Sequence, residues 1–119
     1  MSDLKPTGAK IKLGDKEYPL LFDINAIDDI QDHFDIPIAQ ISDLLKDERK
    51  AYKTLKYLLT VLINEGLDDA ENGEKHVTEN FVGRKITPAN MGELKDGILA
   101  SFVDSTPKIT DDSPNLTSE

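Results

Sequence analysis

The feature that most constrains this chain is an apolar helical stretch, residues 51–66. Apolar side chains recur there at i, i+4, i+7 and i+11, which is the spacing of one helix face. Between positions 57 and 63 only Thr60 is polar, so this half of the helix is apolar almost all round. Such a helix must be covered on more than one side, either by the rest of the chain or by a partner. The apolar face consists of Ala51, Leu55, Leu58 and Leu62, widened by Tyr52, Leu59 and Ile63.

Length and composition limit the classes of protein to consider. The 119 residues match one domain, and the lack of cysteine excludes disulfides and thiolate chemistry. The N-terminus lacks the apolar segment of a secretory signal, and no apolar run is long enough to span a membrane. We therefore expect a soluble protein of the cytoplasm.

The net charge of −9 disfavours binding to nucleic acid or to anionic membranes, because both need a basic face. One segment departs from this balance, since residues 46–56 carry five basic side chains against two acidic ones. The cluster is either the solvated face of a helix, paired in space with Asp28, Asp29 or Asp32, or a docking surface for an acidic partner segment. Its members are Lys46, Arg49, Lys50, Lys53 and Lys56.

Alternating polar and apolar residues on both sides of a short glycine turn predict a β-hairpin over residues 10–22. Asp23 or Asn25 can cap a following helix with a buried stripe of Ile24, Ile27, Ile30 and Phe34. Pro37 suits the start of a second, shorter helix that continues to about Lys46. The long apolar helix follows from about Glu48, and we expect it to end at Gly66, because glycine favours the position after the last turn.

We interpret residues 67–85 as an acidic loop with room for one short turn, and Thr87 and Pro88 as the start of a last helix that ends near Asp104. The predicted fold is α+β, mainly α, with an N-terminal hairpin packed on about four helices. Residues 1–9 are expected to form a flexible N-terminus, residues 10–104 a single domain, and residues 105–119 a disordered acidic tail. The buried positions expected in the last helix are Met91, Leu94, Ile98 and Phe102.

Candidate chemical motifs are weak. Residues 68–79 match an EF-hand loop only in part, because Ala70 stands where an oxygen ligand is required. Asp28, Asp29 and Asp32 have magnesium-binding spacing, but the neighbouring isoleucines should occupy the inner helix face. Neither His33 nor His76 has a second ligand at metal-binding spacing. We assign no catalytic, cofactor-binding or metal-binding residue, and we expect no enzymatic activity.

The order of the segments carries a family resemblance. A hairpin reading KIKLGDKEYPLLFDINAI leads into a helix, a leucine-rich helix reads YLLTVLINEGL, and the last helix reads ITPANMGELKDGILASF. Over residues 10–102 this arrangement resembles the tail assembly chaperones of long-tailed, siphovirus-type bacteriophages and of prophages of Gram-positive bacteria. The resemblance implies a non-enzymatic protein of the bacterial cytoplasm. Such a protein coats the tape-measure protein and keeps it soluble until tail-tube subunits polymerise around it.

The resemblance also implies that a longer, frameshifted form recruits tail-tube protein, and the acidic end of this chain fits the short form. Three alternatives remain at this point: a small phage structural or connector protein, an acidic inhibitor or antitoxin-like adaptor, and an enzyme.

Tape-measure binding predicts an apolar groove on this chain. The candidate residues lie on the leucine-rich helix and on the start of the last helix, although the leucines can equally form the core. If the chain leaves the leucine-rich helix uncovered, we expect self-association through it. The candidate partner-binding residues are Tyr57, Leu58, Leu59, Leu62, Ile63, Met91, Lys53 and Lys56.

Overall fold

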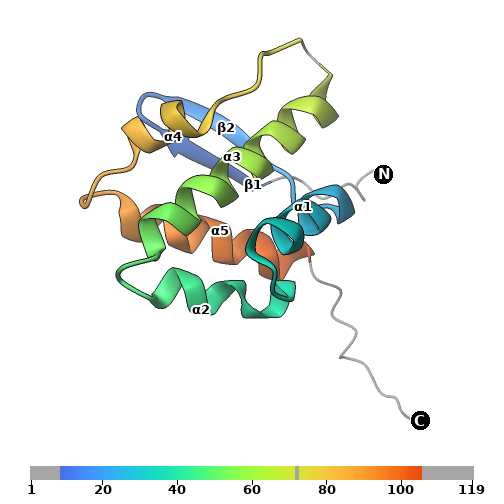
Figure 1. Ribbon diagram of the computed structural model, residues 1–119. Helices are drawn as coiled ribbons and strands as arrows, with labels where there is room; N and C mark the ends of the chain where they lie inside the picture. The colour runs from blue at the N-terminus through green and yellow to red at the C-terminus, as the bar shows by residue number, and fades with distance from the viewer. Residues whose placement is uncertain (1–8, 72, 106–119) are drawn as a thin grey trace.

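The computed structural model describes residues 9–71 and 73–105, and it confirms the predicted α+β, mainly α, class. The predicted flexible N-terminus and acidic tail lie outside the described residues, apart from Ala9 and Ser105. Those two residues belong to the first strand and the last helix. The elements are β1 Ala9–Leu13, β2 Lys16–Leu20, α1 Ile24–Phe34, a short 3-10 helix Ile38–Gln40, α2 Ile41–Lys46, α3 Ala51–Ala70, α4 Glu79–Lys85 and α5 Met91–Ser105 (Figure 1).

The hairpin forms where the alternating pattern predicts it. β1 and β2 are antiparallel, with Leu13 opposite Lys16 and with Gly14 in the turn at a φ of 65°. This positive φ suits glycine, which has no Cβ to clash. Ile11 and Leu13 of β1 and Tyr18 and Leu20 of β2 are buried, so the hairpin presents one apolar face to the helices.

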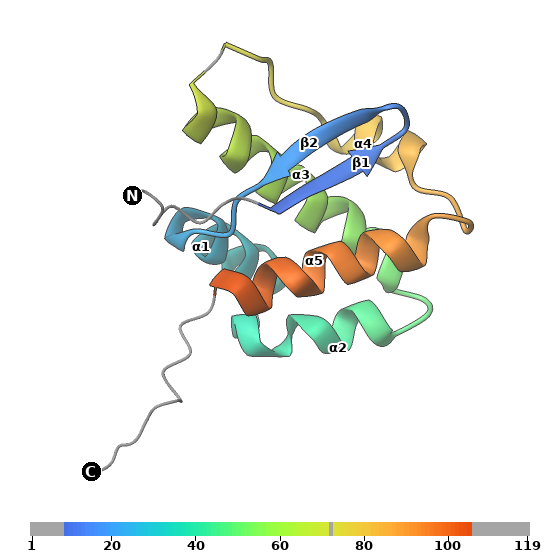
Figure 2. The same cartoon turned by 180° about the vertical axis from the view of Figure 1, so that it is seen from behind.

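α3 is the central element, and the rest of the chain is arranged around it (Figures 1 and 2). β2, α1, α2, α4 and α5 all pack against it. Its core side chains are 0% exposed, so the chain itself covers the apolar half of the helix. The condition under which we expected self-association through this face is therefore not met. These fully covered side chains are Leu55, Leu58, Leu59, Leu62 and Ile63.

Gly66 does not end the long helix, so that prediction is wrong. α3 continues to Ala70, and Glu71 caps it in a left-handed conformation, with its N–H donating to Asp68 O. Gly66 is instead the place where the hairpin approaches the helix. A Cβ atom on Gly66 would lie 2.9 Å from Pro19 Cβ, and Leu21 N donates to Leu62 O at 3.0 Å. Glycine is required here for close packing and not for termination.

α1 begins as predicted, because Asp23 Oδ1 accepts a hydrogen bond from Ala26 N–H at 3.0 Å. Its predicted buried stripe is partly wrong. Ile24 is 73% exposed, whereas Ala26 and Ile30 are fully buried. Ile24 is the first residue of α1, at the end of the helix that the core does not reach.

Residues 67–85 are not one loop, which corrects a second prediction. α3 occupies the first part of this segment, and α4 occupies the last part. Thr78 Oγ1 caps α4 by accepting from Phe81 N–H at 3.0 Å, and Val82 anchors α4 in the core. Thr87 lies in the turn before α5, where its N–H donates to Asn90 Oδ1 and its Oγ1 accepts from Asn90 N–H. α5 therefore begins at Met91 and not at Pro88. Within the described residues, no helix combines the length and apolar composition that a membrane crossing needs.

Candidate functional site

The structure divides the eight candidate partner-binding residues into three groups. Leu58, Leu59, Leu62 and Ile63 are all 0% exposed and belong to the core cluster. A partner cannot reach them in the folded chain, so their assignment as binding residues is wrong. The alternative that the sequence left open, that they form the core, is the correct one.

Tyr57 joins α3 to α1. Its ring stacks on the ring of His33, with the centroids 3.8 Å apart, and meets Phe34 edge-on at 5.4 Å. Its hydroxyl donates to the backbone oxygen of Asp29 at 3.3 Å. Burial, followed by the nearby carboxylates of Asp29, Glu79 and Asp32, raises the pKa of Tyr57. Each of these contacts lies within the chain, so Tyr57 is a packing residue.

The other three candidates, Lys53, Lys56 and Met91, lie on the surface around the first turns of α3. This surface also carries Tyr52, which is 44% exposed, contrary to the prediction that Tyr52 widens the buried face. Three hollows open here. The α2 hollow, of about 430 Å³, is lined by His33, Phe34, Ile36, Leu44, Lys50, Lys53 and Thr54. The α4 hollow, of about 290 Å³, is lined by Tyr52, Lys53, Lys56, Gly83 and Ile86. The α5 hollow, of about 380 Å³, is lined by Leu45, Lys46, Glu48, Ala51, Tyr52, Met91 and Lys95.

The three hollows adjoin one another, and we call them together the basic surface of α3. Lys53 lines both the α2 and the α4 hollow, and Tyr52 lines both the α4 and the α5 hollow. No ion pair within the described part of the chain engages Lys50, Lys53 or Lys56, so the pairing with the α1 aspartates that we considered is not seen. These hollows therefore combine apolar lining residues with three lysines that form no ion pair among the described residues.

The α2 hollow has a distinctive floor. Thr54 lines it while being only 1% exposed, and its hydroxyl has no hydrogen-bond partner among the described residues. The walls are the half-buried side chains of Phe34, Ile36 and Leu44. A buried hydroxyl without a partner is destabilising, which makes this position unusual.

No family model, curated protein or solved structure matches this chain significantly.

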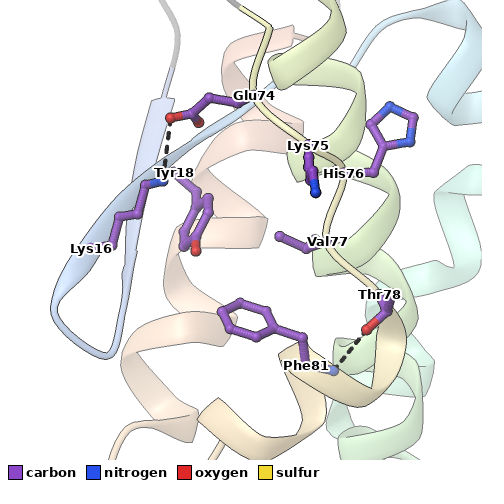
Figure 3. A pocket seen from close by; sticks show the side chains of 8 residues that line it. All are labelled: Lys16, Tyr18, Glu74, Lys75, His76, Val77, Thr78 and Phe81. Atoms are coloured by element: carbon purple, nitrogen blue, oxygen red, sulfur yellow. Dashed lines mark hydrogen bonds and ion pairs between the residues drawn. The ribbon is translucent and has the colours of Figure 1, made fainter.

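A fourth hollow, of about 340 Å³, lies between the hairpin and the segment before α4 (Figure 3). Tyr18, Val77 and Phe81 face one another across it, and Lys16 and Glu74 form an ion pair of 3.2 Å at one rim. Thr78 is already engaged as the α4 cap, and His76 bonds to Asp68 at 2.8 Å. Because Lys16, Glu74, His76 and Thr78 already have partners, this hollow offers a ligand fewer free polar groups than its lining suggests.

The sequence motifs considered for metal binding are separated by the fold. Asp68 lies within α3 and Glu79 within α4, so residues 68–79 do not form the single loop that an EF-hand requires. Asp28, Asp29 and Asp32 are exposed on α1. In residues 9–71 and 73–105, no group of three or more histidine or acidic side chains is placed to share a metal ion.

Proposed function

We propose that this protein is a non-enzymatic tail assembly chaperone that binds the tape-measure protein in the cytoplasm of a bacterial host and keeps it soluble. The segment order that resembles this family supports the proposal. The observation that carries it is the basic surface of α3, where exposed Tyr52 stands between two hollows on a chain whose net charge is −9. Exposed aromatic and basic residues beside apolar hollows are typical of protein-binding surfaces.

The adjoining hollows suit a helical partner. In the family that this chain resembles, the tape-measure protein is long and helical and exposes apolar stripes before assembly. A helix laid across a groove inserts side chains at intervals of three or four residues, and adjoining hollows can receive them. The proposed binding role thus moves from the buried leucines to Tyr52, Lys53, Lys56 and Met91.

The test is co-expression with the tape-measure protein from the same genome. We expect that protein to become soluble and to co-purify with the chain. The double variant Tyr52→Ala, Lys53→Glu should lose both effects while keeping its fold. Lys12→Glu is the matched control, because Lys12 is an exposed lysine on the hairpin, outside the basic surface. A tape-measure protein that stays insoluble and unbound with the unmodified chain would overturn the proposal.

A second measurement separates a chaperone from a structural component of the tail. A chaperone leaves before the particle is complete, so purified particles should lack this chain in mass spectrometry. Retention at a fixed copy number per particle would favour the small structural or connector protein instead.

A further inference from the structure

We infer that the α2 hollow receives an aromatic side chain with a hydrogen-bonding group, tyrosine or tryptophan, presented by an acidic segment of the partner. This inference rests on the proposed function only for the identity of the partner. Its chemistry comes from three properties of the hollow, namely its walls, its floor and its rim.

The walls favour a large apolar group. Phe34, Ile36 and Leu44 come from α1, the following connection and α2, and all three are only partly buried by the chain. At about 430 Å³ the hollow is large enough for one aromatic side chain. Inserting such a side chain would remove the remaining apolar surface of these walls from water, which is the main favourable term in association.

The floor favours a polar group on that side chain. Thr54 is 1% exposed, and its hydroxyl lacks a partner among the described residues. A hydroxyl both donates and accepts hydrogen bonds, so it can pair with a phenol or an indole N–H. Buried tyrosine and tryptophan usually need such a partner, whereas leucine or phenylalanine would leave the Thr54 hydroxyl unpaired.

The rim selects the flanking charge. Lys50 and Lys53 line the hollow, and no described acidic residue pairs with either one. They are part of the basic cluster on a chain that is otherwise acidic. Glutamates or aspartates beside the aromatic residue would meet these lysines, and basic flanking residues would be repelled.

The chain itself offers no equivalent group. Its acidic C-terminal residues, 106–119, contain no aromatic side chain. Tyr52 is the exposed aromatic of the described residues, and it already stands on the basic surface, where a second copy would bring lysines against lysines. We therefore commit to a separate acidic partner.

The experiment uses the full chain and a short peptide with one central tryptophan flanked by glutamates. The chain has no tryptophan, so tryptophan emission reports on the peptide alone. We expect a saturable blue shift as the indole enters the hollow. Replacing the glutamates with lysines should weaken binding at least tenfold, roughly what loss of two charge pairs gives. Added salt should also weaken binding of the acidic peptide, because it screens the charge pairs with the lysines.

Two variants test the floor and the rim separately. Thr54→Val keeps the shape of the side chain and should weaken the peptide by about two- to tenfold, the value of one hydrogen bond. Lys50→Glu with Lys53→Glu should reverse the charge preference, while the control Lys12→Glu should leave it unchanged. Circular dichroism would verify that each variant is folded. A blue shift that survives both the Thr54 and the lysine changes would overturn the inference.

The outcomes separate this inference from the proposed function. If the chain solubilises the tape-measure protein but does not bind the peptide, the inferred aromatic anchor is wrong and the chaperone function stands. If the peptide binds but the tape-measure protein stays insoluble, the chaperone function is wrong and the hollow is a site for another acidic partner. If the peptide fails to bind and Lys53→Glu abolishes self-association of the chain in sedimentation, the occupant is a second copy and the inference is wrong.

Discussion

The two halves of α3 differ in how completely the rest of the chain covers them. In the second half, Leu62 and Ile63 are 0% exposed, and Leu62 O accepts a hydrogen bond from Leu21 N, just after the hairpin. The first half carries Tyr52 and Lys53 at the surface, between hollows that the chain leaves open. The first half also contributes Leu55 to the core, but the rest of the chain leaves its outward side uncovered. The binding surface lies where the apolar face is incomplete and lysines border it.

The largest expected effect separates a buried position of α3 from an exposed one. Leu58→Ala would leave a cavity in the core and should lower the free energy of unfolding by about 3 kcal/mol. In a domain of this size that loss lowers the melting temperature by more than about 10 °C. Tyr52→Ala, on the same helix, should change stability by less than about 0.5 kcal/mol. Thermal unfolding followed by circular dichroism would measure both; equal losses would contradict this difference in burial.

A smaller effect is expected at Gly66, in the second half. Gly66→Ala would place a Cβ atom 2.9 Å from Pro19 Cβ and force the hairpin away from α3, costing about 1–3 kcal/mol. The matched control is Gly92→Ala in α5, where no atom lies within 4 Å of the added carbon. Since alanine favours helices, this control should stabilise the fold by about 0.5–1 kcal/mol. Chemical denaturation of both variants would show the opposite signs, and a stabilised Gly66→Ala would refute the close packing.

Thr54 is the buried polar residue of the first half of α3, and its substitution should have opposite effects in two assays. Thr54→Val removes a buried hydroxyl that has no partner, so stability should stay equal or rise by up to about 1 kcal/mol. The same change should weaken the tryptophan peptide. Urea denaturation beside the fluorescence titration would measure both quantities. A clear loss of stability would indicate that the hydroxyl has a role in the fold.

The smallest effect concerns Glu65, an ionisable residue in the second half. Burial, opposed by a hydrogen bond from Asn25 at 3.1 Å and assisted by neighbouring Asp23, raises the pKa of Glu65 above its ordinary value of 4.5. The folded chain thus holds this proton to a higher pH than the unfolded chain does. The stabilising contribution is present at low pH and is lost as pH rises from 4.5 through the raised value.

Glu65→Gln should therefore stabilise the protein at neutral pH, by less than about 1 kcal/mol for a group that remains partly solvated. Its advantage over the unmodified chain should disappear below the ordinary glutamate pKa. Denaturation at several pH values would show this trend, and a gain that grows as the pH falls would contradict the assigned direction.

The sequence predicted the elements that depend on local signals. The hairpin follows from alternation around Gly14, and the start of α1 follows from the capping side chain of Asp23. Gly66 was misinterpreted because a glycine that ends a helix and one that admits a neighbouring chain look alike until Pro19 is placed beside it. α4 was missed because it is short and depends on Val82 reaching a core built by distant segments.

The candidate site was predictable only in part. The cluster of lysines was visible in the sequence, and Lys53, Lys56 and Met91 do lie on one surface. Tyr52 and Thr54 were not identified as site residues, because helical periodicity predicts the face on which a residue lies but not which other elements pack beside it. Three elements, α1, α2 and α3, must come together before Thr54 becomes the floor of a hollow. Tyr52, an aromatic residue within the basic cluster, was a further signal for this surface, but its spacing led us to place it on the buried face.

The hydrogen bond from Leu21 N to Leu62 O, 3.0 Å long, links the end of the hairpin to α3, so hydrogen exchange at this amide can report on their separation. Its amide proton can exchange with deuterated solvent only when the chain after β2 lifts from the helix. The exchange rate at Leu21 therefore reports how often the hairpin opens, independently of fraying within the strands. If a bound tape-measure segment tightens the first turns of α3 alone, that rate should stay constant. A slower exchange rate on binding would show that the partner also stabilises the contact between the hairpin and the second half of α3.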